Sequence, residues 1–216
     1  MSSLTSTRTL LGVRILVIAA LLTGLTGSPA IAAGATLQIG QPAPEFSATD
    51  SKGRSLSLSQ YRGKTVVLEW TNNGCPYTQK HYESGNMQSL QKEWTGKGVV
   101  WLTMLSSAPG EQGFMTPAQE NQYIAREHAA PTAAILDSHG AIGHEYDAKT
   151  TPHMFIIDPS GRLIYEGAID DHATPNPSDI KQSKNYVSDA LRESMGGKQV
   201  TTSYTRPYGC SIKYAD

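Results

Sequence analysis

The sequence predicts an α/β fold, and three observations lead to this prediction. Residues 65–70 (TVVLEW) and 98–106 (GVVWLTMLS) are apolar runs rich in β-branched residues, as in strands that are buried on both faces of a sheet. The segment between them is expected to be helical, and a strand–helix–strand unit indicates a parallel strand pair. Residues 152–167 (PHMFIIDPSGRLIYEG) predict a β-hairpin, because two apolar runs flank the turn signal Asp-Pro-Ser-Gly.

The first 33 residues have the three parts of a secretory signal peptide. A positively charged start without acidic residues precedes a short apolar stretch at residues 15–25, and small residues then permit cleavage after Ala32 or Ala33. The apolar stretch is shorter than the roughly 20 residues that cross a bilayer, so a retained anchor is the less favoured alternative. We therefore expect export, to a periplasm, followed by cleavage and no stable membrane insertion.

The part that remains, residues 34–216, has the length of a single domain with its own core, and no repeat or linker divides it. The whole chain has 18 basic and 19 acidic residues without a basic stripe, so nucleic acid is not an expected partner. The sequence contains two cysteines, Cys75 and Cys210. In an exported protein these can form a structural disulfide or take part in redox chemistry.

The other elements follow from local signals. Residues 46–58 predict an N-terminal β-hairpin, two short strands around an Asp-Ser-Lys-Gly turn. A threonine followed by proline predicts the start of a helix over residues 116–128. Residues 140–148 favour a brief helix, and a last helix is expected over Ser178–Met195, ended by two glycines. The tail, residues 197–216, has no helical periodicity.

The helix between the first two strands is expected to begin at Pro76 and to continue to about Trp94, with Gly85 as a point where it can be interrupted. Cys75 therefore lies at a helix N-terminus, where unpaired N–H groups and the helix dipole stabilise an anion. We expect a lowered pKa for this thiol. The thiolate is the form of cysteine that reacts.

Thr78 lies three residues after Cys75, where a C-x-x-C motif has its second sulfur. Its hydroxyl can donate a hydrogen bond to the Cys75 sulfur, but it cannot attack a mixed disulfide. Resolution must therefore come from Cys210 or from an external thiol. Three arrangements of the two cysteines remain open: a reversible bond, a permanent bridge that holds the tail, or no contact.

Five motifs, in chain order, are GQPAPEF, GKTVVLEW, GCPYTQKHY, TTPHMFIIDPSGRLIYEGAIDD and YGCSIKY. Together they resemble the redoxin branch of the thioredoxin superfamily, and more narrowly the exported thioredoxin-like proteins of the alkyl hydroperoxide reductase/thiol-specific antioxidant group. The resemblance covers nearly the whole of residues 34–216. It implies a thioredoxin fold, a central mixed sheet flanked by helices, with the N-terminal hairpin as an extension and an irregular C-terminal tail.

The resemblance also implies roles for individual residues. Cys75 would be the nucleophile, beside Pro76 at the start of the helix. The peptide bond between Thr151 and Pro152 would be cis, and this loop would offer backbone groups to an extended substrate. His153 would lie near the sulfur and tune its charge. We therefore expect Pro76, Thr151, Pro152 and His153 to form the substrate site.

The sequence departs from the family in ways that bear on activity. The peroxiredoxin signature requires a proline and a threonine or serine where this chain has Leu68 and Asn72, and those groups orient a peroxide. Thr78 breaks the two-cysteine pattern of thioredoxins. Glu69, on the strand that leads into the site, could act as the buried acid of thioredoxins, but glutamate is rarely buried, so we expect it to face outward.

Other charged residues near Cys75 are expected at the surface. Lys80 and His81 lie one turn into the helix, where they could add positive potential, but solvation is the more common outcome. The six histidines show no helical metal-ligand spacing, and no second ligand lies at zinc spacing from Cys75. We expect surface or loop histidines, no metal site and no cofactor.

These residues predict an exported thiol-disulfide oxidoreductase. Cys75, assisted by Thr78, attacks a disulfide, and Cys210 or an external thiol releases the mixed disulfide. The partners would be protein or small-molecule thiols and disulfides. Two alternatives remain open: a thiol peroxidase that acts through a Cys75 sulfenate, and a binding module that has the fold without turnover.

Overall fold

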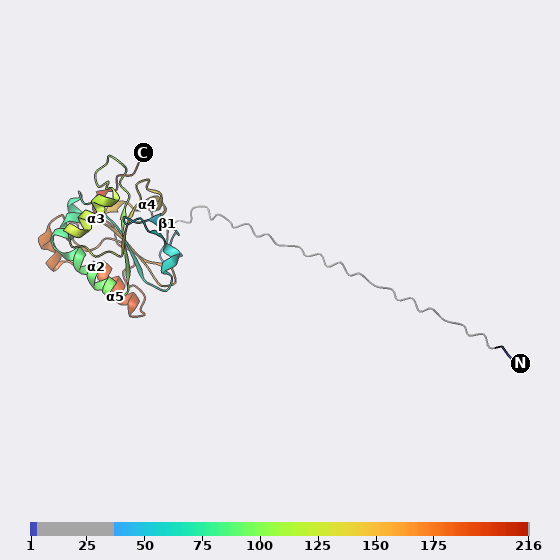
Figure 1. Ribbon diagram of the computed structural model, residues 1–216. Helices are drawn as coiled ribbons and strands as arrows, with labels where there is room; N and C mark the ends of the chain where they lie inside the picture. The colour runs from blue at the N-terminus through green and yellow to red at the C-terminus, as the bar shows by residue number, and fades with distance from the viewer. Residues whose placement is uncertain (4–36, 216) are drawn as a thin grey trace. The chain divides into compact units, whose positions relative to one another are not determined.

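The chain folds around a five-stranded mixed β-sheet (Figure 1). This computed structural model describes residues 1–3 and 37–215. The strands are β1 (Ser47–Thr49), β2 (Ser55–Ser57), β3 (Val66–Trp70), β4 (Val100–Leu105), β5 (Ala133–Leu136), β6 (Thr150–Thr151), β7 (His153–Ile157), β8 (Leu163–Gly167) and β9 (Cys210–Ser211). The helices are α1 (Pro76–Glu83), α2 (Asn86–Gly96), α3 (Pro117–Arg126), α4 (Ala141–Glu145) and α5 (Tyr186–Met195), with short 3-10 helices η1 (Leu58–Tyr61) and η2 (Pro177–Gln182).

Strand β3 is the centre of the main sheet, whose strand order is β5-β4-β3-β7-β8. It runs parallel to β4, with Val66 opposite Val100, and antiparallel to β7, with Trp70 opposite His153. Strands β4 and β5 are parallel, and β7 and β8 form the predicted hairpin. The predicted α/β class, parallel pair and mixed sheet are therefore confirmed.

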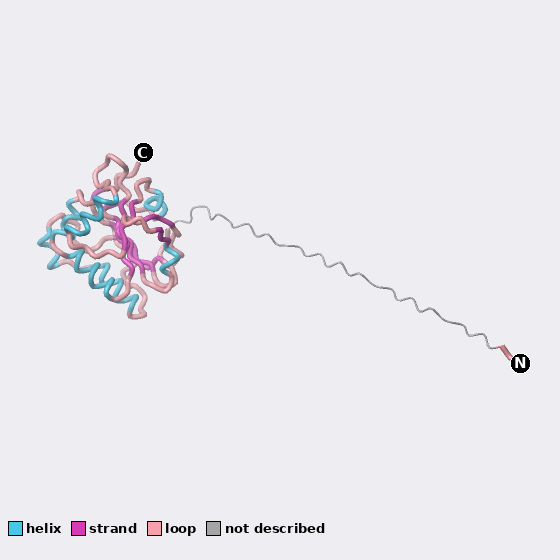
Figure 2. Tube along the Cα trace, in the orientation of Figure 1, coloured by secondary structure: helices cyan, strands magenta, loops and turns pink. Residues whose placement is uncertain are grey.

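Both faces of the sheet are covered, because the side chains of β3 alternate between two cores. Leu68 and Trp70 pack with residues of the β1–β2 hairpin, η1 and α4. Val67 lies on the other face and packs with residues of α1, α2, α3 and α5. Figure 2 shows these four helices on one side of the sheet. A strand enclosed in this way needs an almost continuous apolar run, which residues 65–70 supply.

The helix after Cys75 is interrupted where the sequence allowed it. Helix α1 ends at Glu83, and Gly85, with φ of 75°, is the N-cap of α2. That backbone conformation is left-handed, and glycine adopts it without steric cost. The interruption gives α1 a direction separate from that of α2, while Cys75 stays at the start of the first.

The prediction of one continuous last helix was wrong. Residues 177–182 form the 3-10 helix η2, and α5 begins only at Tyr186. Asn185 is the N-cap of α5, and its side chain accepts a hydrogen bond from the N–H of Ser188 (2.8 Å). The N–H of Tyr186 donates to the carbonyl of Ile169 (2.9 Å). Capping and this tertiary contact set the start of the helix, whereas its end at Met195 is as predicted.

The C-terminal tail is irregular, as predicted, but it is anchored along its length. Its strand β9 pairs antiparallel with β6. Further on, the ring of Tyr214 stacks on His144 with centroids 4.1 Å apart, and its hydroxyl donates to the carbonyl of Ala148 (2.8 Å). The tail therefore returns to the body of the fold next to β6, which directly precedes Pro152.

Residues 4–33 of the predicted signal peptide lie outside the described residues, and so do both predicted cleavage points. Within the described part of the chain, no helix is long and apolar enough to cross a membrane. Export therefore stays a prediction.

The left-handed backbone at Gly85 makes a testable prediction about stability. Gly85→Ala should lower the free energy of unfolding by about 1 kcal/mol, because a side chain disfavours that conformation. Gly96, the last residue of α2, is the matched control, since it has no positive φ and open space around its Cβ position. Gly96→Ala should raise the free energy of unfolding by about 0.5 kcal/mol. Urea denaturation measures both, and equal losses would show that backbone conformation is not the cause.

Candidate active site

Cys75 is the N-cap of α1, and its thiol is enclosed. Its backbone is extended, Pro76 occupies the first turn, and the carbonyl of Cys75 accepts the first helical hydrogen bond from Gln79 (2.9 Å). The N–H of Cys75 donates to the carbonyl of Asn72 (3.0 Å), which fixes the loop before the helix. The residue is 0% exposed. The sulfur thus lies where the unpaired N–H groups of the helix are directed.

Strand β9 brings Cys210 to Cys75. In the register of β6 and β9, Cys210 is opposite Thr151, whose carbonyl accepts a hydrogen bond from the Cys75 thiol (3.0 Å). The two thiols are close enough to shift each other's pKa, and both are free. Cys210 is partly exposed, whereas Cys75 is buried. The structure therefore places the two cysteines side by side, with Cys210 on the solvent side.

The two thiols have opposite pKa shifts. Burial acts to raise the pKa of Cys75, but the neighbouring Cys210 thiol, Thr151, and the backbone of Thr78 and Cys210 bring it below its ordinary value. Burial, together with the hydrogen bond and the charge of Cys75, raises the pKa of Cys210 to about 11. Cys75 therefore ionises first, and Cys210 keeps its proton and donates it to the thiolate.

Thr78 contributes through its backbone rather than through the predicted hydroxyl. The backbone of Thr78 contributes to lowering the pKa of the Cys75 thiol. The hydroxyl is buried and has no hydrogen-bond partner among the described residues. The expected hydroxyl contact was therefore wrong. The backbone N–H of the third helical residue is an ordinary donor to a group at the N-cap, so any residue type there can provide it.

The loop before β7 has the geometry that the resemblance implied. The peptide bond between Thr151 and Pro152 is cis. Gly209 lies against it: a Cβ built at Gly209 would be 2.1 Å from the carbonyl oxygen of Thr151, and its φ is 143°. Only glycine permits this close approach of the tail. The backbone edge that an extended substrate would use is occupied here by the protein's own tail.

His153 is buried at the start of β7. It is 4% exposed, its Nδ1 accepts from the N–H of Lys149 (3.3 Å), and its ring packs on Phe155. Burial lowers the pKa of His153 to about 3, so the imidazole is neutral. A neutral ring adds no positive charge near the sulfur. The influence of His153 on Cys75 therefore stays a prediction.

Glu69 is buried rather than outward-facing, which also corrects a prediction. Its carboxylate accepts hydrogen bonds from Tyr82 (2.9 Å), Gln91 (3.0 Å) and Trp101 (2.7 Å). Burial raises the pKa of Glu69 to about 7 despite these donors. A second acid, Glu120, is 2% exposed, and burial together with Glu69 raises its pKa to about 7. The sequence analysis did not identify Glu120.

Lys80 and His81 are also buried, contrary to the prediction that they are solvated. Lys80 is 0% exposed, and its Nζ lies 3.0 Å from a carboxylate oxygen of Asp170. The Nζ also donates to the carbonyl of His172 (2.6 Å) and to the hydroxyl of Tyr208 (3.3 Å). Burial lowers the pKa of His81 to about 4, so it carries no charge at neutral pH.

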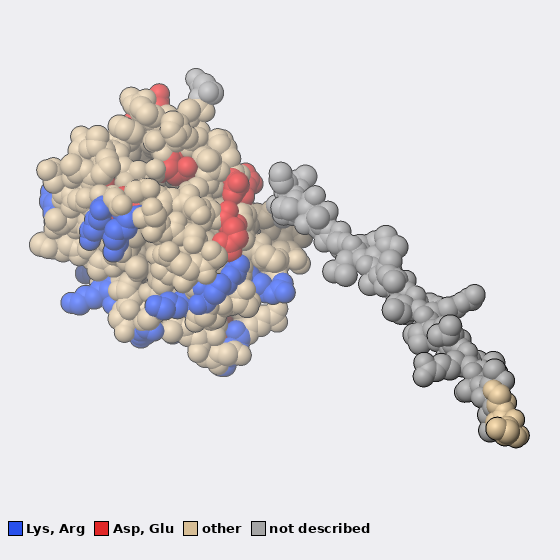
Figure 3. Space-filling model, turned by 45° about the vertical axis from the view of Figure 1, so that its right-hand side comes forward, with Lys and Arg blue, Asp and Glu red and all other residues tan. Residues whose placement is uncertain are grey.

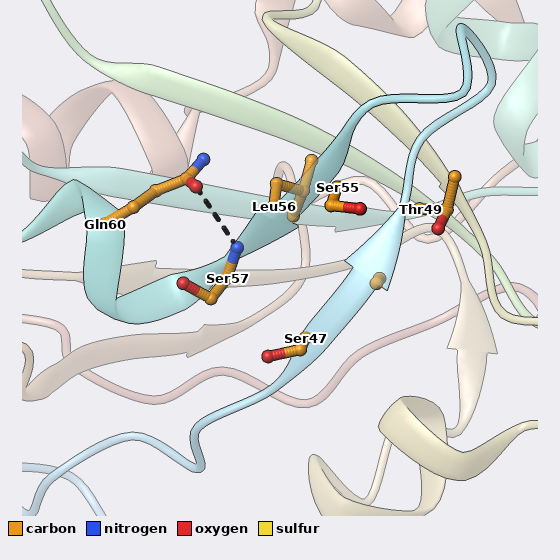
Figure 4. Close-up of a pocket in the computed structure, with 7 residues that line it drawn as sticks. Ser47, Thr49, Ser55, Leu56, Ser57 and Gln60 are labelled. Atoms are coloured by element: carbon orange, nitrogen blue, oxygen red, sulfur yellow. Dashed lines mark hydrogen bonds between the residues drawn. The ribbon is translucent and has the colours of Figure 1, made fainter.

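Other surface features do not compete with this site. A groove on the N-terminal hairpin (Figure 4) is lined by Ser47, Ala48, Thr49, Ser55, Leu56, Ser57 and Gln60. These residues include no thiol and no titratable group.

The surface charge does not mark a second site. On the face shown in Figure 3, Lys and Arg side chains lie mostly below and Asp and Glu side chains mostly above, so neither sign of charge covers that face. Among the described residues, no group of three His, Cys, Asp or Glu side chains could hold a metal ion.

Comparison with known proteins gives a match to one family model and to several relatives. The model of the family described as AhpC/TSA matches residues 39–166. The protein named "Probable glutathione peroxidase 8-B" from Xenopus laevis is 26% identical over 134 residues, which cover 55% of this chain and 62% of that protein. The thiol-disulfide oxidoreductase ResA from Bacillus thuringiensis is 27% identical over 130 residues, 60% of this chain and 69% of that protein.

The frog relative is thus matched over less than two thirds of its own length. Among solved structures, a hypothetical protein from Sinorhizobium meliloti has a TM-score of 0.73 at 21% sequence identity, and the match covers 84% of this chain and 97% of that one. At this level of identity the similarity concerns the fold. Together with the strand order and the helix after Cys75, it places the chain in the thioredoxin fold.

The buried acids predict how stability depends on pH. The pKa values of Glu69 and Glu120 are raised from 4.5 to about 7. Between these values the folded protein binds more protons than the unfolded chain, so the free energy of unfolding falls as pH rises through this window. Glu120→Gln should reduce that fall by about 2 kcal/mol. Denaturation at pH 5 and pH 8 measures it, with Glu83→Gln on the exposed end of α1 as the control, and an unchanged fall would contradict the assignment.

The influence of Cys210 on the pKa of Cys75 predicts a change in ionisation when Cys210 is replaced. Cys210→Ala should raise the pKa of Cys75, because the thiolate loses a donor. Cys210→Ser keeps an O–H donor at the same position and should raise the pKa less. Thiolate absorbance as a function of pH measures both variants. Identical titrations for these variants and the unchanged protein would mean that Cys210 does not stabilise the thiolate.

Proposed function

This chain belongs to the AhpC/TSA family, and on that premise we propose that it is an exported thiol-disulfide oxidoreductase with Cys75 as its nucleophile. The observation that carries the proposal is the pair of adjacent free thiols, Cys75 and Cys210, at the start of α1 beside the cis peptide bond. A lowered pKa makes Cys75 the attacking sulfur, since the thiolate is the nucleophile in disulfide exchange. The relative named ResA is described as an enzyme of this class, which supports the choice.

The reaction begins when the Cys75 thiolate attacks one sulfur of a substrate disulfide. A bond forms between Cys75 and that sulfur, the substrate disulfide breaks, and the other substrate sulfur leaves as a thiolate that takes up a proton. During this step the N–H groups at the start of α1 hold the charge of the attacking sulfur. Because Cys75 is 0% exposed, β9 must move from β6 before an extended substrate can reach it.

Cys210 then resolves the mixed disulfide. Its pKa is raised partly by the charge of Cys75, and this contribution disappears once Cys75 is bonded to substrate. The Cys210 thiolate attacks the Cys75 sulfur, the second substrate sulfur leaves as a thiolate, and a Cys75–Cys210 disulfide forms. The substrate has gained two electrons. An external dithiol returns the protein to its reduced form, and the same steps in reverse transfer a disulfide to a reduced substrate.

The peroxidase alternative has less support at the site. Asn72 occupies one of the two positions that depart from the peroxiredoxin signature, and its side chain is committed to Gln112 and Gly74 by hydrogen bonds of 3.1 and 2.8 Å. At the other, Leu68 is fully buried in the core. Neither side chain is free to orient a peroxide.

Trapping tests the proposed function. Cys210→Ser should accumulate a mixed disulfide between Cys75 and a disulfide-containing peptide, because the resolving sulfur is absent, whereas the unchanged protein should release the reduced peptide. Cys75→Ser should form no adduct in either background. Mass spectrometry after acid quenching identifies the species. Faster loss of the Cys75 thiol with hydrogen peroxide than with the peptide would favour the peroxidase, and no reaction with either would favour a binding module.

A further inference from the structure

A buried polar cluster beside α1 contacts the tail two residues before Cys210. Lys80 and Asp170 are 0% and 1% exposed at their side chains and form an ion pair of 3.0 Å. The hydroxyl of Tyr208 donates to a carboxylate oxygen of Asp170 and accepts from Nζ of Lys80 (3.3 Å). Tyr208 is thus the tail residue that joins this ion pair.

The same cluster connects the tail to the helix that Cys75 caps. Lys80 belongs to α1, and Tyr77 on the same helix meets the Tyr208 ring edge-on, with centroids 5.9 Å apart. The ammonium of Lys80 also lies 5.5 Å from the centroid of that ring. Two side chains of helix α1, those of Tyr77 and Lys80, therefore contact Tyr208. Cys75 caps the N-terminus of the same helix.

Cys210 is fixed between two independent anchors. On the C-terminal side, the N–H of Ile212 donates to the carbonyl of Lys149 (3.1 Å), and the carbonyl of Lys213 accepts from Ala108 (2.7 Å). On the N-terminal side Gly209 provides close approach but no side chain, so the first side-chain anchor is Tyr208. Without that anchor, the next side-chain attachment of the tail before Cys210 is Thr205, which bonds Tyr165 and the N–H of Ala168.

We propose that Tyr208, held by the Lys80–Asp170 ion pair, is a positioning residue that keeps the Cys210 sulfur against Cys75 for disulfide formation. The inference rests on the proposed function, in which Cys210 resolves the mixed disulfide. In this proposal, the hydroxyl of Tyr208 helps to set the effective concentration of the Cys210 thiol at Cys75. A buried ion pair alone is weak evidence for a stabilising role, since burial of both charges costs free energy. Here, however, the ion pair has a third partner, Tyr208, which lies on the tail, so the pair also holds the tail in place.

The test is the equilibrium between the protein dithiol and glutathione disulfide, which measures that effective concentration. Tyr208→Phe keeps the ring against Tyr77 and removes the hydroxyl. We expect the equilibrium constant for the Cys75–Cys210 disulfide to fall about tenfold, as for one lost charge-assisted hydrogen bond. Tyr204→Phe is the matched control, because it removes a hydroxyl from the same tail at a residue that is 59% exposed. It should leave the constant unchanged.

A merely structural role for Tyr208 would give a different result. A loss of packing that is equal in the oxidised and reduced proteins lowers both thermal midpoints and cancels from the glutathione equilibrium. An unchanged constant for Tyr208→Phe would therefore overturn the inference, even if the variant is less stable. If the unchanged protein forms no Cys75–Cys210 disulfide at any glutathione ratio, the proposed function fails instead.

A second variant applies if Tyr208→Phe does not fold. Tyr77→Leu removes the edge-on contact from the α1 side at a partly exposed residue and leaves the ion pair intact. We expect its equilibrium constant to fall about threefold, in line with the weaker aromatic contact. No change in this variant would count against positioning through α1.

Discussion

The candidate active site depends on the pairing of β9 with β6. Two residues of the tail, Cys210 and Ser211, lie antiparallel to Thr150 and Thr151, and this alignment places a second thiol beside the thiol at the start of α1. The lowered pKa of Cys75, the raised pKa of Cys210 and the enclosure of Cys75 all follow from it. A helix N-terminus alone would favour a thiolate. The pairing of β9 with β6 adds Cys210 as a proton donor beside Cys75, and the two sulfurs therefore have different pKa values.

Several charged side chains are buried in this fold. Lys80 and Asp170 pair beside the tail, whereas Glu69 and Glu120 have raised pKa values on the helix-covered face of the sheet. Burial of such groups costs free energy unless donors or opposite charges compensate. Lys80 has a carboxylate, a carbonyl and a hydroxyl, and Glu69 has three donors, so both are well compensated. Even so, the pKa values of Glu69 and Glu120 are both raised to about 7, so both are expected to take up a proton near neutral pH.

Features set by local signals could be predicted from the sequence, and features set by distant contacts could not. Proline after Cys75, the glycine at position 85 and the hairpin turn each determine nearby backbone, so the cap, the helix break and the β7–β8 hairpin were found. The burial of Glu69, Lys80 and His153 depends on partners far along the chain, and residue type alone predicted exposure for the first two. Tyr208 was missed, although the glycine between it and Cys210 was a signal of close backbone approach.

Because β9 comes after the helices and the other strands in the chain, it is also made after them. Synthesis therefore adds Cys210, the partner of Cys75, after the segments that form the sheet and α1. Until then, the sulfur at the start of α1 has no cover and no second thiol. A nascent chain, or one cut before β9, would therefore expose a cysteine that β9 otherwise helps to enclose, with no second thiol beside it.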